Sequence, residues 1–196
     1  MARDGHYRVR FRRRREGVTN YYKRKIMIQS GKPRLVIRKS LKHVQAQIVE
    51  AEPIGDRILV SAHSLELKKL GWYPHSNIPT AYLIGLLIGY KAKEKGITEV
   101  IPDIGLYRPT KGNLLFAALK GAKDAGLEFN LGEEKVPDED RISGVHISDF
   151  ATMLEKENPE LYKRQFSLYL SAGINPKELS KLFEQVKAKI EQSFGG

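Results

Sequence analysis

Arginine and aromatic side chains alternate near the N-terminus in a pattern that suits nucleic acid. Residues 8–15 read RVRFRRRR, and residues 21–25 read YYKRK. A planar guanidinium group can bind two phosphate oxygens at once, and aromatic rings can stack on unpaired bases. The segment therefore predicts an RNA-binding arm. The alternative is a solvated or nuclear-localisation-like charge run.

A second candidate for anion binding is the segment 103–113, DIGLYRPTKGN. Gly105 and Gly112 permit close backbone approach, and Arg108 and Lys111 precede an expected helix, whose N-terminal N–H groups attract anions. The residue order is not that of a Walker nucleotide-binding loop. We interpret the segment as a phosphate-backbone contact, with a plain connecting turn as the alternative.

The residues that could perform catalysis do not form a recognisable set. The five histidines lack the i, i+4 spacing of metal ligands, and no Gly-x-Ser-x-Gly motif occurs. The absence of cysteine excludes disulfides, zinc ribbons, iron–sulfur ligation and thiol nucleophiles. Asp103 ends an expected strand, and we expect it to cap the N–H groups of the glycine turn that follows. We predict no enzyme, cofactor or metal. A metal-dependent nuclease, which would need several carboxylates, is the alternative from the enzyme class.

The positive charge is concentrated in the first fifth of the 196 residues. The formal net charge is +11, but residues 1–42 carry 15 Lys and Arg against Asp4 and Glu16, whereas the remainder is nearly neutral. A basic arm on a neutral body indicates a polyanionic partner. The arm has too little apolar mass to offset its ordering entropy, so we expect it to be disordered when free.

Hydrophobic periodicity predicts the scaffold that positions these residues. We expect an antiparallel meander of strands at 35–37, 43–51 and 57–62, then helical turns over 64–70. A helix from Pro79 to residue 95, a strand at 99–103 and a helix over 113–125 follow. The first long helix is apolar on nearly all sides, and Gly85 and Gly89 would allow it to pack closely on the sheet. These elements predict an α/β fold.

The C-terminal third has a different composition. Residues 128–140 contain six acids and one lysine and are expected to be an exposed linker or loop, followed by helices at 147–156, 159–171 and 176–193. We divide the chain into a basic arm (1–30), an α/β RNA-binding domain (31–130) and an acidic linker with a helical C-terminal extension (131–196). The longest apolar run, 81–89, is too short to span a membrane, and no secretory signal is seen, so we expect an intracellular soluble protein.

Three separated motifs resemble one known family. RVRFRRRREGVTNYYKRK, GKPRLVIRKSLKHVQAQIVE and DIGLYRPTKGN occur in the order found in the large-subunit ribosomal protein family numbered eighteen, in its archaeal form, whose longer eukaryotic relative is numbered five. The likeness covers essentially the whole chain. It implies a ribonuclease-H-like layer fold without nuclease activity. It also implies a structural protein of the cytoplasmic ribosome that binds 5S ribosomal RNA and helps attach it to large-subunit RNA in the central protuberance.

The resemblance also implies which residues contact RNA and which partners are present. Neighbouring large-subunit ribosomal proteins are expected beside the two RNAs, without a membrane or a small-molecule substrate. The loop departs from the bacterial Tyr-His-Gly-Arg pattern, since residues 108–112 read RPTKG. A free-standing nucleic-acid-binding regulator would explain the charge equally well. The implied RNA-binding residues are Arg3, Arg8, Arg10, Phe11, Arg12, Arg13, Arg14, Arg15, Tyr21, Tyr22, Lys23, Arg24, Lys25, Arg34, Arg38, Lys39, Lys42, His43, Arg108 and Lys111.

Overall fold

The centre of the molecule is a mixed four-stranded sheet with the order β3-β2-β1-β4. The structure, a computed structural model, describes residues 5–194. Strands β1 (Arg34–Lys39), β2 (Val44–Ala51) and β3 (Asp56–His63) form the antiparallel meander expected from the sequence, and β4 (Ile101–Asp103) pairs with β1 in parallel. Leu35 pairs with Ile48, and both are fully buried. Period-2 alternation thus directs one face of the sheet into the core.

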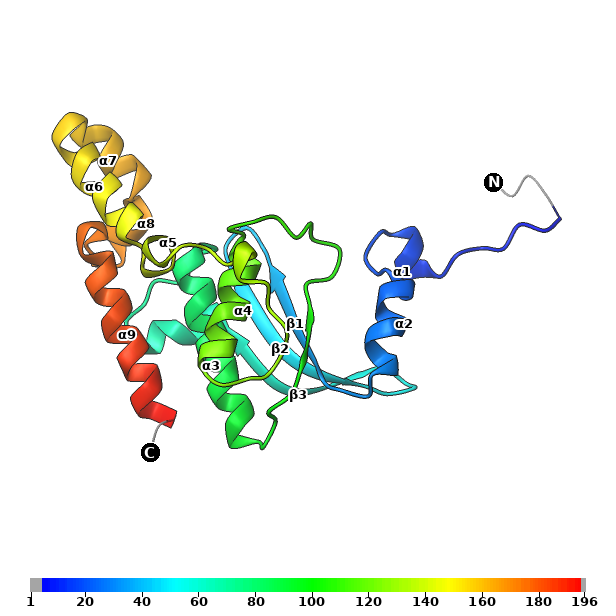
Figure 1. Cartoon of the computed structure of the whole chain (residues 1–196). Helices are drawn as coiled ribbons and strands as arrows, with labels where there is room; N and C mark the ends of the chain where they lie inside the picture. Colours follow the sequence, from blue (N-terminus) through cyan, green and yellow to red (C-terminus); the bar gives the residue numbers. More distant parts are fainter. Residues whose placement is uncertain (1–4, 195–196) are drawn as a thin grey trace.

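Two long helices cover that buried face (Figure 1). They are α3 (Ile78–Glu94) and α4 (Leu114–Asp124), and each begins at an asparagine whose side chain accepts a backbone N–H of the first turn. Asparagine is a favoured N-cap because its side-chain oxygen replaces the missing helical acceptor. The expected helices are therefore confirmed within one or two residues at each end.

The glycines of α3 serve a different contact from the one expected. A Cβ atom added at Gly85 would lie 1.9 Å from the carbonyl oxygen of Ala118, and one at Gly121 would lie 2.2 Å from that of Tyr82. Both neighbours belong to the facing helix. The expectation of close helix-on-sheet packing is therefore wrong for Gly85, and also for Gly89, where an added Cβ atom would lie 2.4 Å from the Ala125 Cβ at the end of α4. Both glycines allow α3 and α4 to approach each other closely.

The C-terminal region packs on the body through its last helix. The 3-10 turn η1 (Ser64–Leu70) lies between β3 and α3, in the body. The C-terminal region begins with the 3-10 turn η2 (Glu133–Lys135) and continues with α5 (Glu139–Ser143), α6 (Val145–Glu157), α7 (Pro159–Gln165), α8 (Ser167–Ser171), η3 (Pro176–Glu178) and α9 (Leu179–Phe194). Phe183 of α9 contacts the rings of Trp72 and Tyr82, so the extension and the body share one core. The helix expected over 159–171 is divided at Phe166.

The N-terminal arm lies on the opposite side of the sheet from α3 and α4 (Figure 1). It contains the short helix α1 (Arg12–Arg15) and the longer helix α2 (Tyr21–Gln29), which is capped by Asn20. The sequence predicts a disordered arm in the free protein, whereas the structure has a helix over Tyr21–Gln29. The structure differs because the Asn20 cap and an ion pair from α2 to the sheet hold the second helix in place. In the part of the chain that the structure describes, no helix is long and apolar enough to cross a membrane.

Candidate nucleic-acid interface

A chain of alternating arginines and aspartates joins the arm to the sheet. Arg24 of α2 donates two hydrogen bonds to the Asp56 carboxylate, at 2.8 and 2.5 Å. Asp56 also accepts a hydrogen bond from Arg34 at 2.6 Å, and Arg34 donates a second one to Asp103 at 2.8 Å. Arg38 completes the chain with a 3.3 Å contact to Asp103. Three guanidinium groups thus neutralise two carboxylates at the outer face of the sheet.

The outer half of this chain shifts the acid titration of Asp56. Its two arginine partners lower the pKa of the carboxyl from 3.8 to about 2, the hydrogen bond from Arg24 being the largest contribution. The same contact raises the pKa of Arg24. Asp56 is therefore ionised at every physiological pH and holds the arm helix against the sheet as a charged partner.

Arg34 is buried in the middle of this chain. Its side chain is only 4% exposed, and its two terminal nitrogens are committed to Asp56 and Asp103. Direct RNA contact by Arg34 stays a prediction, and the structure gives this guanidinium two protein partners at its terminal nitrogens. Its role in the structure is to fix the positions of Asp56 and Asp103 relative to each other.

Asp103 caps the glycine turn, as expected from the sequence. Its Oδ1 accepts the backbone N–H of Gly105 at 2.7 Å, and its backbone carbonyl accepts a hydrogen bond from Arg38. Gly105 has a φ of +65°, and a Cβ atom there would lie 3.0 Å from the guanidinium carbon of Arg38. The positive φ favours glycine, and any larger side chain would also have to displace the Arg38 guanidinium. The turn therefore packs directly on Arg38, which remains 42% exposed.

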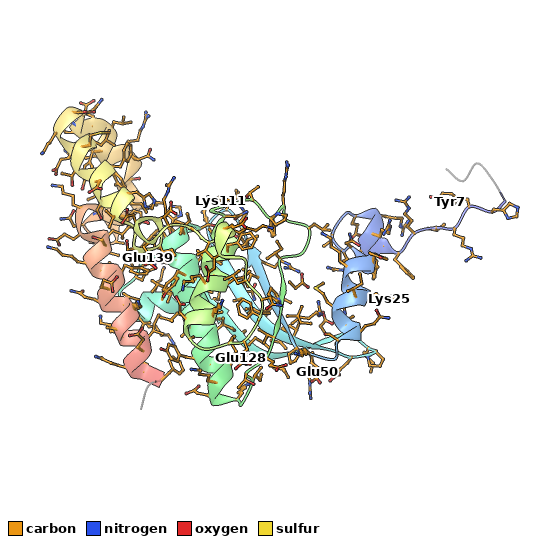
Figure 2. The ribbon with its side chains drawn as sticks, in the orientation of Figure 1. Tyr7, Lys25, Glu50, Lys111, Glu128 and Glu139 are labelled. Atoms are coloured by element: carbon orange, nitrogen blue, oxygen red, sulfur yellow. The ribbon has the colours of Figure 1, made fainter. Side chains whose placement is uncertain are left out.

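The rest of the loop is fixed to the end of β1. The Tyr107 hydroxyl donates a hydrogen bond to the Lys39 carbonyl at 2.8 Å, and the Lys39 ammonium lies 5.8 Å from the centre of the Tyr107 ring. Arg108 and Lys111 are exposed on the same loop. Figure 2 shows Lys111 on the body of the molecule and Lys25 across the sheet on α2. The loop is thus held at the end of β1 by Tyr107, and its Lys111 lies apart from Lys25 of the arm (Figure 2).

Lys42 and His43 occupy the β1–β2 turn at the same end of the sheet. Lys42 is exposed, whereas the His43 ring is partly buried, with Nδ1 2.9 Å from the Ser64 hydroxyl and its centre 5.1 Å from the His63 ring. Burial lowers the pKa of His43, and the nearby cations lower it further. His43 is therefore neutral at pH 7, so it can offer RNA a hydrogen bond but not a charge.

A cleft separates the arm from the outer face of the sheet. It has a volume of about 370 Å³. Its residues come from the arm, from β1 and β2, and from the Asp103 turn. Polar and charged side chains share the lining with apolar ones. The full lining comprises Arg13, Val18, Thr19, Asn20, Tyr21, Lys23, Arg24, Met27, Arg34, Val36, Arg38, Gln47, Asp56, Asp103, Gly105 and Leu106.

The cleft brings together only some of the implied RNA-binding residues. Phe11 lies outside the lining, and its ring contacts that of Tyr21 in a tilted arrangement with the ring centres 5.1 Å apart. The N-terminal stretch continues away from the body, and Tyr7 lies far out along it (Figure 2). Arg3 lies outside the described residues. The remaining arm candidates are exposed and do not line the cleft: Arg8, Arg10, Arg12, Arg14, Arg15, Tyr22 and Lys25.

Sequence reasoning missed the polar floor of the cleft. Gln47 lies on β2 and lines it, although no charge or motif marks this residue. The signal that could have found it is alternation. Gln45 and Gln47 occupy the positions of β2 between the buried Val44, Ala46 and Ile48, so they face away from the core.

The carboxylates of this region are not arranged to hold a metal. Both Asp103 oxygens and both Asp56 oxygens already accept hydrogen bonds from arginine or from backbone N–H. Among residues 5–194, no group of three or more potential ligands could hold a metal ion. The arrangement therefore offers cations and polar groups to a ligand and does not offer the open carboxylates that metal-dependent nucleases use.

Comparison with known proteins identifies the family. Residues 5–99 match the family described as "Ribosomal large subunit proteins 60S L5, and 50S L18". The chain is 54% identical over 196 residues to "Large ribosomal subunit protein uL18" of Caldivirga maquilingensis, which covers 99% of this chain and 95% of the relative. It is 52% identical over 194 residues to the protein of the same name from Thermofilum pendens, covering 98% of this chain and 99% of the relative. The chain belongs to the uL18 family.

Membership of the uL18 family confirms the resemblance found in the three motifs. It makes this chain a structural protein of the large ribosomal subunit and not an enzyme. The nuclease alternative and the free-standing regulator are therefore both set aside. The two alignments include the acidic segment and the C-terminal helices, since they cover 99% and 98% of this chain.

Proposed function

We propose that this uL18-family chain binds 5S ribosomal RNA and helps attach it to large-subunit RNA in the central protuberance of the cytoplasmic ribosome. The observation that carries the proposal is the placement of the basic arm. Its helix α2 is held by Arg24 across a polar cleft from the sheet, while the arginines of 8–15 remain exposed. Such an arrangement gives RNA a fixed surface on the sheet and a polycationic segment that can extend along the RNA phosphates.

The proposed contacts are the exposed arm residues, Arg38 beside the Asp103 turn, and the cations of the loop and of the β1–β2 turn. Each of these groups is exposed or partly exposed and lies on the outer side of the sheet or at its end. Neighbouring large-subunit ribosomal proteins are the proposed partners of the remaining surface. We also propose that the layer is of the ribonuclease-H-like class, since a three-strand meander followed by a parallel strand has helices on one face.

A competition experiment tests the choice of RNA. The full chain is titrated with labelled 5S RNA at moderate salt, against unlabelled 5S RNA and against an unrelated structured RNA of the same length and charge. Specific binding is typically 10³-fold or more tighter than non-specific binding of nucleic acid. We expect the unrelated RNA to compete at least about 100-fold more weakly. Equal competition by the two RNAs would overturn the proposal.

The loop contribution is tested by removing its two cations. Charged hydrogen bonds contribute about 1.5–3 kcal/mol each before screening, so Arg108→Ala with Lys111→Ala should weaken 5S RNA binding by about 1–3 kcal/mol in total. Both side chains are exposed, so the melting temperature should not change.

The matched control for the loop is Lys163→Ala with Arg164→Ala on α7. This pair has the same charges and is also exposed, and it lies on the C-terminal extension. The control variant should bind 5S RNA as tightly as the unaltered chain. If both double variants bind alike, the loop contributes only diffuse charge and is an ordinary turn.

A further inference from the structure

The floor of the cleft contains polar groups that the fold leaves without partners. Arg34 Nε is buried and has no hydrogen-bond partner, the only such side-chain atom within residues 5–194. The side-chain amide of Gln47, half-buried on the same floor, also makes no hydrogen bond. An unsatisfied buried polar group costs about 1–3 kcal/mol. Among the described residues, Arg34 Nε is the one group in this fully buried class, whereas the half-buried Gln47 amide lines the cleft and is the polar group on this floor that a ligand can reach.

The lining of the cleft is divided between apolar and cationic side chains. Val36, Met27 and Leu106 provide apolar surface, whereas Arg13, Lys23 and Arg38 provide positive charge. The volume of about 370 Å³ lies at the lower end of the roughly 300–1,000 Å³ range of small-molecule sites. A bare phosphate needs no apolar wall, and an apolar side chain needs no cations. A nucleotide needs both, together with polar groups for the edge of its base.

We propose that the cleft receives a single unpaired nucleotide of the bound RNA. Its base would lie between Val36 and Leu106 with its edge toward the Gln47 amide, and its phosphate would lie among Arg13, Lys23 and Arg38. The amide of glutamine can donate and accept at once, which matches the mixed edges of the bases. The inference rests on the proposed function, because it names the part of the RNA that this interface selects.

The acids beside the cleft do not oppose an incoming phosphate. Asp56 and Asp103 are each bound by two guanidinium groups, and the three arginines of the chain outnumber them. Arg38 keeps 42% of its side chain exposed after making these contacts. The cleft is therefore positive overall, and its acids act to fix the positions of the arginines.

Free nucleotides provide a direct test of the cleft. The full chain is titrated with AMP, GMP, CMP and UMP to millimolar concentration, with inorganic phosphate as comparator. The signals followed by NMR are the Gln47 side-chain amide, the Val36 methyl groups and the Gly105 backbone N–H. We expect at least one nucleotide to shift all three, and inorganic phosphate to leave the Gln47 and Val36 signals in place.

A matched pair of variants on one strand separates the cleft from the rest of the sheet. Gln47→Met removes the polar edge but keeps the side-chain length, and Gln45→Met makes the same change two residues away on the same face, outside the cleft. Losing one hydrogen-bonding group should weaken nucleotide and 5S RNA binding about three- to tenfold in Gln47→Met. Gln45→Met should stay within about twofold of the unaltered chain, and both should melt alike.

The outcomes distinguish this inference from the proposed function. Equal shifts with inorganic phosphate, no shift with any nucleotide, or equal behaviour of the two glutamine variants would overturn the nucleotide cleft, even if 5S RNA binds specifically. Nucleotide binding that Gln47→Met weakens, in a chain that fails to prefer 5S RNA, would instead count against the proposed function.

Discussion

Arg34 has a charged side chain in a place where charge is costly. Burial of an ion in a protein interior carries a penalty of several kcal/mol, which a well-oriented counter-ion can offset. Arg34 has two such counter-ions, because one terminal nitrogen donates a hydrogen bond to Asp56 and the other donates one to Asp103. Removal of one partner leaves a buried charge only half compensated. Arg34 is therefore a positioning residue, which fixes Asp56 and Asp103 through its hydrogen bonds.

Removing the Asp103 carboxylate should destabilise the whole body. Breaking a buried ion pair costs about 3–5 kcal/mol, and Asp103→Ala also removes the cap of Gly105. Because Arg34 keeps Asp56, we expect a loss near the lower end, about 3 kcal/mol in the free energy of unfolding, measured by denaturant titration. Asp103→Asn keeps an acceptor for Gly105 and should lose less.

The control for this measurement is an exposed ion pair. Arg57 contacts Glu50 and Glu52 at the β2–β3 turn, and all three side chains are at least 45% exposed. Exposed pairs contribute little because water screens them. Arg57→Ala should therefore leave the denaturant midpoint nearly unchanged. Equal losses in Arg57→Ala and Asp103→Ala would contradict a structural role for the buried pair.

At the scale of elements, α2 is joined to the body by an acid whose protonation can be controlled. The pKa of Asp56 is about 2, below its usual 3.8, so the carboxylate binds fewer protons when α2 is docked. Its contribution to docking is then complete above about pH 4 and is lost as the pH falls toward 2. We expect the backbone amides of 21–29 to lose protection from exchange in this window, before those of α3 and α4.

The variant Asp56→Asn isolates this titration. Without the carboxylate, the amides of 21–29 should exchange rapidly at every pH, with no change between pH 4 and 2. The comparison uses α3 and α4 as internal references, so general acid unfolding is recognised. If α2 in the unaltered chain stays protected at pH 2 while Asp56→Asn also protects it, other contacts hold the helix.

The contact between α3 and α4 depends on a glycine at its closest point. Gly85→Ala would place a Cβ atom 1.9 Å from a backbone oxygen of Ala118, so one of the two helices must move. Overpacking of a core costs about 1–3 kcal/mol, and a rigid carbonyl puts this variant at the upper end. Gly132→Ala meets no atom within 4 Å and serves as control. Thermal melting should separate the two variants by more than about 5 °C, since 1 kcal/mol shifts the melting temperature of a 150–250-residue domain by about 2–4 °C and the expected loss is near 3 kcal/mol.

Much of the scaffold was predictable because local patterns and tertiary packing agree. The alternation of apolar and polar residues predicts the strands of the meander, and the asparagine N-caps predict where α3 and α4 begin. The contact at Gly85 was assigned to the wrong neighbour, because a helix that is apolar on all sides does not reveal which face meets the sheet. The division at Phe166 also escaped notice, since its apolar residues continue the helical pattern.

Only some residues of the candidate site could be predicted from the sequence. Its cations were evident from composition, and the cap from Asp103 to Gly105 followed from their spacing. The burial of Arg34 was not evident, because its partners lie 22 and 69 residues away in the chain. Gln47 carries no charge and belongs to no motif, so only its position opposite the arm marks it. Long-range contacts decide which polar residues meet, and a local pattern does not contain them.

At the scale of the whole molecule, opposite charges occupy different regions. The arm carries the positive excess, whereas residues 128–140 contain six acids and one lysine and follow α4 on the other side of the sheet (Figure 2). RNA attracted to the first region is repelled by the second. The charge distribution thus orients the chain on its RNA before any specific contact forms, and the arginines of the arm should dominate the long-range attraction.

Deleting residues 2–18 tests this dominance without disturbing the docked helix. The deletion removes Arg3, Arg8, Arg10 and the four arginines of 12–15 together with two acids, but it keeps the Asn20 cap and the pair between Arg24 and Asp56. Each phosphate neutralised contributes about 0.7–0.9 to the slope of log K against log salt. If about five of the seven arginines act in this way, the slope for 5S RNA should become shallower by about 3.5–4.5.

The comparison variant replaces the same seven arginines by lysine. It keeps the charge, so its salt slope should match that of the unaltered chain, while the loss of bidentate guanidinium contacts lowers its affinity at every salt concentration. Circular dichroism of the lysine variant should match that of the unaltered chain, and the deletion variant should differ only by the loss of α1, because the arginines of 8–15 are exposed. A deletion variant whose slope is unchanged would place the phosphate contacts on the body of the protein, with the cleft and the loop as the main interface.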